Sequence, residues 1–125
     1  MRILIVEDSR LVQQMYGLAF SRREHELTMA SDGRAALTQI ADPASRFDVI
    51  LLDLRMPGMN GVEFLREVRR DVRLAQIPIV LTTMEPEGSE LLTEARRPGV
   101  TAVVKKPWHP QELRDLVEAI VHRGK

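Results

Sequence analysis

The segment Leu51–Gly61 has the sequence LLDLRMPGMNG, and it places one acid, Asp53, at the end of an apolar run. Pro57 and Gly58 follow closely, and residues of these two types are typical of turns. We therefore expect the chain to leave a buried strand sharply just after this carboxylate. The segment is either an ordinary connection between a strand and a helix or the position of a reactive acid.

Short apolar runs alternate with helical patterns along the whole chain. The best runs are continuously apolar, which is typical of strands that helices cover on both faces of a sheet. Five strand–helix units with right-handed crossovers predict an α/β fold with a doubly wound parallel sheet. Ligands of such a sheet lie outside the carboxyl ends of its strands. The expected strands are residues 3–6, 27–30, 49–52, 77–81 and 101–104.

Capping residues mark the starts of several expected helices. Asp32 and Asn60 are plausible caps for the second and third helices, and Pro110 suits the first turn of the last. The first helix is expected within residues 9–21, and the fourth, residues 87–97, has the weakest pattern. Four arginines between positions 66 and 73 are expected to lie on a solvated helix face.

The composition excludes several classes of protein. A chain of 125 residues, 44% of them hydrophobic, fits a single domain at 1–125. Basic and acidic residues are equally numerous, so no overall electrostatic field would attract the protein to nucleic acid or to an anionic membrane. The apolar runs are too short to span a bilayer, and acids follow the first apolar run too soon for a signal peptide. With no cysteine present, we expect a soluble cytoplasmic protein.

Polar side chains follow the best-predicted strands, and the carboxyl ends of parallel strands meet at one edge of a sheet. Any one of these side chains has an ordinary explanation, such as capping a helix or being solvated. Their convergence on one edge favours a functional site instead. The residues are Glu7-Asp8, Asp53, Thr82-Thr83 and Lys105-Lys106.

The chemistry of these groups suits a metal-assisted phosphoryl transfer. Three converging carboxylates repel one another, so at least one pKa should rise unless a cation is present. Carboxylate oxygens suit Mg²⁺, which keeps several waters and takes one or two carboxylates. A lysine and a hydroxyl opposite them could hold a phosphoryl group. An aspartate can itself be the nucleophile and form an aspartyl-phosphate.

This pattern resembles the receiver domain of two-component response regulators, and it is similar to the stand-alone chemotaxis regulator. The resemblance covers essentially the whole chain, and its D-x-x-M-P-x-M-x-G motif is specific. It implies a flavodoxin-like fold with strand order 2-1-3-4-5, five helices and three layers. The matching pieces are IVED at 5–8, DLRMPGMNG at 53–61, PIVLTT at 78–83 and KKP at 105–107.

The resemblance also implies a metal site. Asp8 is expected to bind Mg²⁺ directly, together with Asp53, while Glu7 acts through water or as a second ligand. The backbone carbonyl of Arg55 would complete the protein's share of the ligands. The turn residues after Asp53 would let the chain expose the carboxylate and present this carbonyl to the metal.

The same resemblance makes Asp53 the phosphoacceptor. Thr83 would hydrogen-bond the phosphoryl group, and Lys106 would be its charge partner. Lys105 is a weaker candidate, because in similar domains the lysine directly precedes the proline, often across a cis bond.

The function implied is a signalling switch rather than an enzyme that turns over an external substrate. A sensor histidine kinase or a phosphotransfer protein would donate the phosphoryl group to Asp53. The new charge would bias a two-state equilibrium in residues 84–122, the region of the fourth helix, fifth strand and last helix. That face would bind a downstream protein or an output domain, and a phosphorylation-dependent dimer through it is left open. The sequence does not specify the kinase, the stimulus or the target.

Five residues depart from the family or lie beside its site. Met84 occupies a position that is usually small, so it either narrows access to the site or packs on the surface. Val103 stands where Tyr or Phe is common, which puts the usual coupling to the output face in doubt. Arg55 and Glu85 could pair over the site and shield a phosphoryl group from water. Trp108 replaces the usual Phe and is expected to be partly buried.

Three alternative functions remain. A Mg²⁺-dependent phosphatase resembling the haloacid dehalogenase class would need D-x-D, but Leu54 and Arg55 follow Asp53. A nucleotide-binding module is disfavoured because no G-x-G-x-x-G or P-loop is present. A receiver-fold scaffold that has lost phosphorylation is opposed by the intact acids, threonine and lysine, but Val103 and Met84 leave it open.

Overall fold

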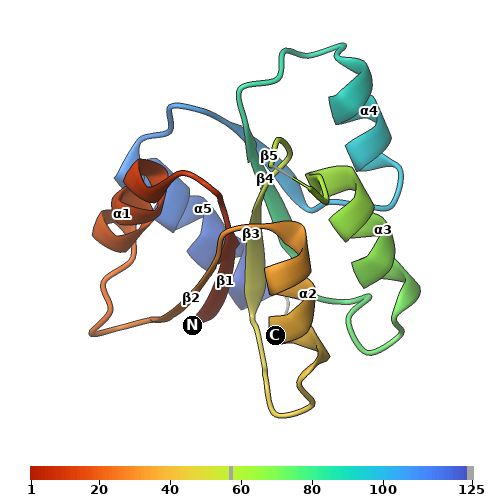
Figure 1. The fold of residues 1–125 in the computed structure, drawn as a ribbon. Coiled ribbons are helices and arrows are strands. Elements are labelled where there is room, and N and C mark those ends of the chain that lie inside the picture. The colour runs from red at the N-terminus through yellow and green to blue at the C-terminus, as the bar shows by residue number, and fades with distance from the viewer. Residues whose placement is uncertain (57, 124–125) are drawn as a thin grey trace.

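Figure 1 shows the computed structural model, which describes residues 1–56 and 58–123. The strands are β1 (Arg2–Val6), β2 (Glu26–Ala30), β3 (Val49–Asp53), β4 (Ile79–Thr83) and β5 (Ala102–Lys105). The helices are α1 (Arg10–Ala19), α2 (Gly33–Ala41), α3 (Gly61–Arg70), α4 (Glu90–Arg96) and α5 (Pro110–Arg123). All strand pairs are parallel, in the order β2-β1-β3-β4-β5. The predicted α/β fold, its strand order and its five helices are confirmed.

Helices cover both faces of the sheet, which explains the continuously apolar strands. Leu4 of β1 packs with Phe64 and other residues of α2, α3 and α4 on one face. Ile5, one position along, packs with Val117 and other residues of α1 and α5 on the opposite face. All five residues of β3 and of β4 are buried. Burial of each large apolar side chain contributes about 1.5–3 kcal/mol, so these two clusters hold the three layers together.

The predicted caps of α2 and α3 are confirmed, and the starts of two elements differ from the prediction by more than one residue. Asp32 accepts a hydrogen bond from the first turn of α2, and Asn60 forms a reciprocal capping box with Glu63. β4 begins after Pro78, which cannot donate to the ladder, so the predicted strand started too early. The predicted start of the fourth helix was also wrong, because Gly88 has a φ of 90° and the helix begins after it.

The connection from β3 to α3 is sharp because the helix starts against the strand that precedes it. A Cβ on Gly61 would lie 2.8 Å from the carbonyl oxygen of Asp53 and 2.8 Å from Cα of Leu54. The Gly61 amide donates a hydrogen bond of 2.9 Å to the Leu54 carbonyl. Glycine is therefore needed at position 61 for close approach of the backbone. Pro57, which the sequence also marked in this turn, lies outside the described residues.

Arg69 is not part of a solvated helix face, contrary to the expectation for this basic stretch. Its guanidinium donates hydrogen bonds to the carbonyls of Ala75 and Ile77, both at 3.0 Å, and of Gly99 at 3.1 Å. These hydrogen bonds attach the segments that precede β4 and β5 to α3. Within the described part of the chain, no helix has the length and apolar character needed to cross a membrane.

Replacing Arg69 should destabilise the fold more than replacing its neighbour. We expect Arg69→Met to lower the free energy of unfolding by about 1.5–3 kcal/mol, because hydrogen bonds from charged groups contribute about that much. The control is Arg70→Met in the same helix, whose exposed pair with Glu67 should contribute less than about 1 kcal/mol. Urea unfolding of both variants measures the difference. Equal losses would show that the carbonyl contacts of Arg69 do not stabilise the fold.

Candidate functional site

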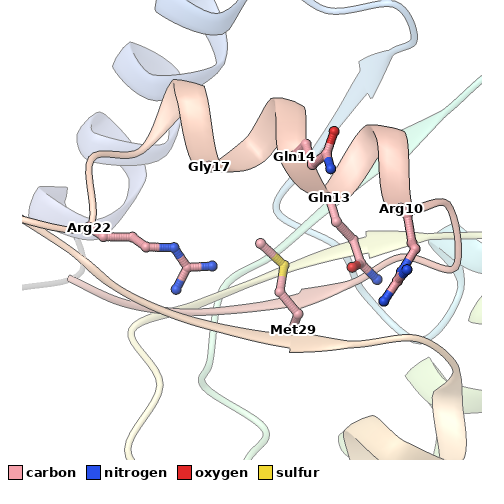
Figure 2. A pocket seen from close by; sticks show the side chains of 6 residues that line it. All are labelled: Arg10, Gln13, Gln14, Gly17, Arg22 and Met29. Carbon is pink, nitrogen blue, oxygen red and sulfur yellow. The ribbon is translucent and has the colours of Figure 1, made fainter.

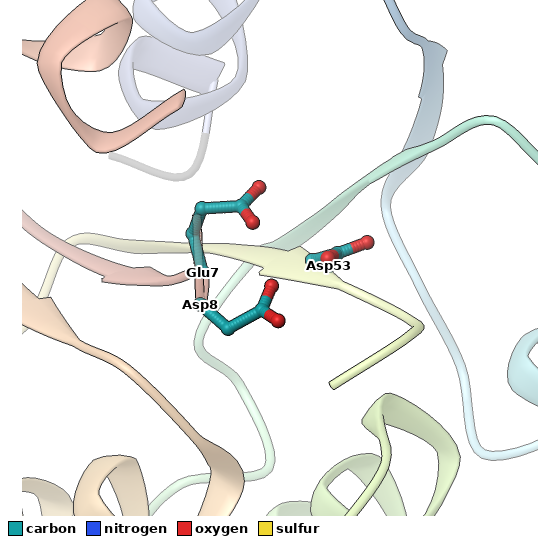
Figure 3. Close-up of side chains that lie close together, drawn as sticks. All are labelled: Glu7, Asp8 and Asp53. Atoms are coloured by element: carbon teal, nitrogen blue, oxygen red, sulfur yellow. The ribbon is translucent and has the colours of Figure 1, made fainter. Parts of the chain in front are cut away.

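The acidic side chains meet at the carboxyl ends of the central strands. Glu7 and Asp8 directly follow β1, and Asp53 is the last residue of β3. Figure 3 shows that these three side chains lie close together beside the ends of the two strands. One oxygen from each lies within 4.8 Å of the others. Pairing of β1 with β3 thus brings together acids that are separated by more than forty positions in the sequence.

Lys106 supplies the positive charge of this cluster. Its Nζ lies 2.7 Å from Oε1 of Glu7 and 3.5 Å from Oδ1 of Asp53. Its backbone amide donates to the carbonyl of Thr83 at 2.9 Å, and a cis peptide bond joins it to Pro107. Lys105 is exposed and lines a different cavity. Of the two candidate lysines, the structure brings only Lys106 to the acids.

Burial makes the two inner acids harder to ionise. Glu7 is 1% exposed, and desolvation raises its pKa, although its hydrogen bond from Lys106 acts in the opposite direction. Desolvation likewise raises the pKa of Asp53, against the lowering effect of the Lys106 charge. When all are ionised, one ammonium faces three carboxylates, so negative charge is left in excess. The cluster therefore favours a divalent cation.

The oxygen donors fit a magnesium ion. Oxygens on opposite sides of one Mg²⁺ lie about 4.2 Å apart, close to the span of the three carboxylates. Asp8 is exposed, which leaves room for the water ligands that Mg²⁺ retains. Asp8 and Arg55 also line one cavity of about 300 Å³.

A second cavity of about 320 Å³ opens beside Asp53. Thr83 is buried at its wall, and its hydroxyl accepts a hydrogen bond of 3.0 Å from the amide of Glu85. The amide of Arg55 approaches Oδ1 of Asp53 at 3.4 Å. This cavity provides space for a small anionic group between an acid, a hydroxyl and an ammonium. Its lining residues are Asp53, Arg55, Thr83, Met84, Glu85 and Lys106.

An ion pair links two loops at the mouth of this cavity. Nη2 of Arg55 lies 2.5 Å from Oε1 of Glu85, as the sequence suggested for this pair. The Arg55 side chain is 76% exposed, whereas that of Glu85 is 11% exposed. Met84 lines the same cavity and is 79% exposed. The pair and the methionine are therefore positioned to control access to Asp53.

One buried contact near the site was missed from the sequence. The Tyr16 hydroxyl lies 2.6 Å from Oγ1 of Thr82, on the face of β4 opposite Thr83. Burial raises the pKa of Tyr16, so it remains neutral. Its ring centroid lies 4.8 Å from that of Trp108, which is more fully buried than expected, at 7% exposure. Val103 is half-buried against the core on the other face.

Known proteins share this sequence pattern and this fold. The family described as "Response regulator receiver domain" matches residues 3–118. Chemotaxis protein CheY of Pseudomonas aeruginosa is 34% identical, with 98% of each chain covered. The structure resembles Vibrio cholerae CheY4 with a TM-score of 0.85, 33% identity and coverage of 95% of this chain and 97% of the other. It resembles the phosphorylated cyanobacterial phytochrome response regulator RcpA with a TM-score of 0.80 at 28% identity, over 95% and 89% of the chains.

Removing one acid from the cluster should stabilise the metal-free protein. A raised pKa means that the folded state holds its proton more tightly than the unfolded chain, so stability falls as pH rises above the ordinary carboxyl pKa. We therefore expect Asp53→Asn to raise the urea midpoint at pH 7 in EDTA and to weaken this pH dependence. Asp115→Asn removes an exposed acid of α5 as a control and should change stability by less than about 0.5 kcal/mol. A lower midpoint for Asp53→Asn would contradict the described charge excess.

Proposed function

Because the chain belongs to the response regulator receiver domain family, and is thus a phosphoacceptor switch of two-component signalling, we propose that Asp53 is the residue that accepts the phosphoryl group. The observation that carries this proposal is the position of Asp53, whose Oδ1 lies 3.5 Å from Nζ of Lys106 and whose carboxylate is grouped with those of Glu7 and Asp8. Its carboxylate also lines a cavity of sufficient size for a phosphoryl group. The donor is a phosphohistidine of a sensor kinase or of a phosphotransfer protein.

The transfer follows from the positions of these side chains. A carboxylate oxygen of Asp53 forms a bond to phosphorus while the bond from phosphorus to the donor nitrogen breaks, and the electron pair stays on that nitrogen. Lys106 faces the oxygens of the transferred group, and the hydroxyl of Thr83 donates a hydrogen bond to one of them. Glu7, Asp8, Asp53 and the Arg55 carbonyl would hold Mg²⁺. The ion neutralises phosphoryl charge when it is bound.

The switch begins with contacts that exist before phosphorylation. A phosphoryl group on Asp53 carries about two negative charges in place of the single charge of the carboxylate, and its oxygens compete with Glu7 for Lys106. The Thr83 hydroxyl would leave the Glu85 amide in order to reach the new oxygens. Both changes would displace the β4–α4 loop and the end of β5. The two segments are linked because the Lys106 amide donates a hydrogen bond to the Thr83 carbonyl. We infer that residues 84–122 rearrange as a result and bind a downstream protein or an output domain, or pair two copies.

We propose that residues 1–125 form one receiver domain and that this domain acts in the cytoplasm. The absence of cysteine fits a reducing compartment. The chain would promote its own phosphorylation and dephosphorylation and turn over no external metabolite. Neither nucleic acid nor membrane is expected as a direct partner.

Phosphorylation from a small donor tests the proposal directly. With acetyl phosphate and Mg²⁺, we expect the intact mass to rise by one phosphoryl group, and EDTA should prevent this rise. Asp53→Asn should remove the modification, and Lys106→Ala should slow it by at least about tenfold, because it removes the charge opposite the phosphoryl oxygens. Asp115→Asn serves as the control. A label on another residue, or labelling that is indifferent to the metal, would exclude this function for Asp53.

The ion pair at the cavity mouth should lengthen the life of the phosphorylated form. We expect Arg55→Ala, Glu85→Ala and the double variant to dephosphorylate several-fold faster, because water then reaches the phosphoryl group more freely. Because the Glu85 side chain is only 11% exposed, Arg55→Ala alone should lower the urea midpoint, whereas the double variant removes both charges and should hardly change it. A matched control removes the exposed pair of Glu67 and Arg70 in α3. The measurement is the rate at which the phosphorylated form disappears in each variant. Unchanged dephosphorylation rates would mean that the pair does not shield Asp53.

A further inference from the structure

A groove runs between α1 and the edge strand β2, apart from the cluster of acids. Its volume is about 500 Å³, and it is open rather than enclosed. Figure 2 shows side chains from the helix, from the turn after it and from β2 facing this space. No acidic residue is among those that line it. The lining residues are Arg10, Gln13, Gln14, Gly17, Arg22 and Met29.

Two arginines give the groove its charge. Arg10 and Arg22 lie at its opposite ends, with Met29 between them (Figure 2). Within residues 1–56 and 58–123, no carboxylate lies within ion-pair distance of either guanidinium. A guanidinium presents a planar fork of donors that matches a carboxylate. The groove therefore has two unused positions for anionic groups.

Gly17 keeps the helix side of the groove open. Glycine inside a helix costs about 1 kcal/mol relative to alanine. A Cβ at this position would meet nothing within 4 Å, so internal packing does not require glycine. Its absence of a side chain instead allows an occupant to approach the backbone of α1.

The shape favours an extended peptide over a small molecule. Small ligands usually occupy concave and mostly apolar pockets, whereas this groove is open and lined largely by polar residues. From Arg10 to Ala19, α1 is about 13.5 Å long at its usual rise. Residues i and i+4 of an extended chain are separated by about 13 Å, and residue i+2 lies on the same face between them. The order of an acid, an apolar residue and a second acid in this pattern matches the order of Arg22, Met29 and Arg10 along the groove.

We propose that this groove binds an extended acidic segment of a partner protein, with one carboxylate on Arg10, one on Arg22 and an apolar side chain on Met29. The thioether of methionine adapts readily to apolar groups of different shape. Gln13 connects the groove to the site, because its Nε2 donates to the carbonyl of Glu7 at 2.6 Å. The binding itself does not depend on phosphorylation of Asp53, so the two proposals can fail separately.

An NMR titration of the ¹⁵N-labelled protein tests this binding. The probe is an end-blocked peptide with the sequence Glu-Ala-Leu-Ala-Glu, compared with Lys-Ala-Leu-Ala-Lys. We expect saturable amide shifts centred on residues 10–22 and 26–30 with the acidic peptide only. The double variant Arg10→Gln/Arg22→Gln should bind at least tenfold more weakly. The control double variant Arg34→Gln/Arg46→Gln removes the same charge from exposed positions outside the groove and should bind normally.

A groove-filling variant separates binding from folding. Gly17→Leu should retain or raise the urea midpoint, because leucine favours helix, yet it should weaken peptide binding at least tenfold. If both arginine double variants bound the acidic peptide equally weakly, the binding would depend only on the net charge of the protein, and the proposal would be overturned. Shifts outside the groove would do the same, as would the absence of saturation. If inorganic pyrophosphate saturated the groove amides while the acidic peptide did not, the site would be one for small anions and the peptide proposal would be wrong.

Discussion

The contact of Lys106 with Glu7 and Asp53 is the interaction on which the site depends. The ammonium compensates part of the charge of three carboxylates, two of which are buried. A buried ion pair of this kind is seldom a net source of stability, because desolvation offsets its attraction. Its consequence here is to position the side chains. It holds the Lys106 ammonium beside Asp53 and leaves an excess of negative charge that a metal ion can neutralise. The proposed phosphorylation of Asp53 would offer the same lysine phosphoryl oxygens in place of the Glu7 carboxylate.

The fold serves this interaction by delivering side chains from distant segments to one edge. The apolar clusters on both faces fix the strands, and their parallel register sets where each chain end emerges. Gly61 lets α3 begin against β3, so the chain turns away directly after Asp53. Arg69 binds the segments that lead into β4, which ends at Thr83, and into β5, which Lys106 directly follows. The precision of the site therefore depends on contacts well outside it.

Much of this arrangement could be predicted because its signals are local. Continuous apolar runs, capping residues and polar strand ends lie within a few positions of one another, and together they predicted the parallel sheet and the meeting of Asp53 with the Lys105-Lys106 pair. The strand order and the choice of Lys106 were implied by the resemblance to receiver domains. The hydrogen bond from Arg69 to Gly99 and the bond between Tyr16 and Thr82 could not be predicted in this way, because their partners lie 30 and 66 positions away in the sequence and no motif marks them. Gly61 was recognised as a turn residue, but only the structure shows that close approach to Leu54 requires it.

A crystal structure with Mg²⁺ and beryllofluoride, a stable analogue of the phosphoryl group, tests the central claim most directly. We predict that beryllium binds a carboxylate oxygen of Asp53 and that Nζ of Lys106 moves from Glu7 to a fluorine atom. The metal should lie between Asp8 and Asp53. Beryllofluoride on a different carboxylate, or a Lys106 that keeps its contact with Glu7 while the analogue is bound, would contradict the account.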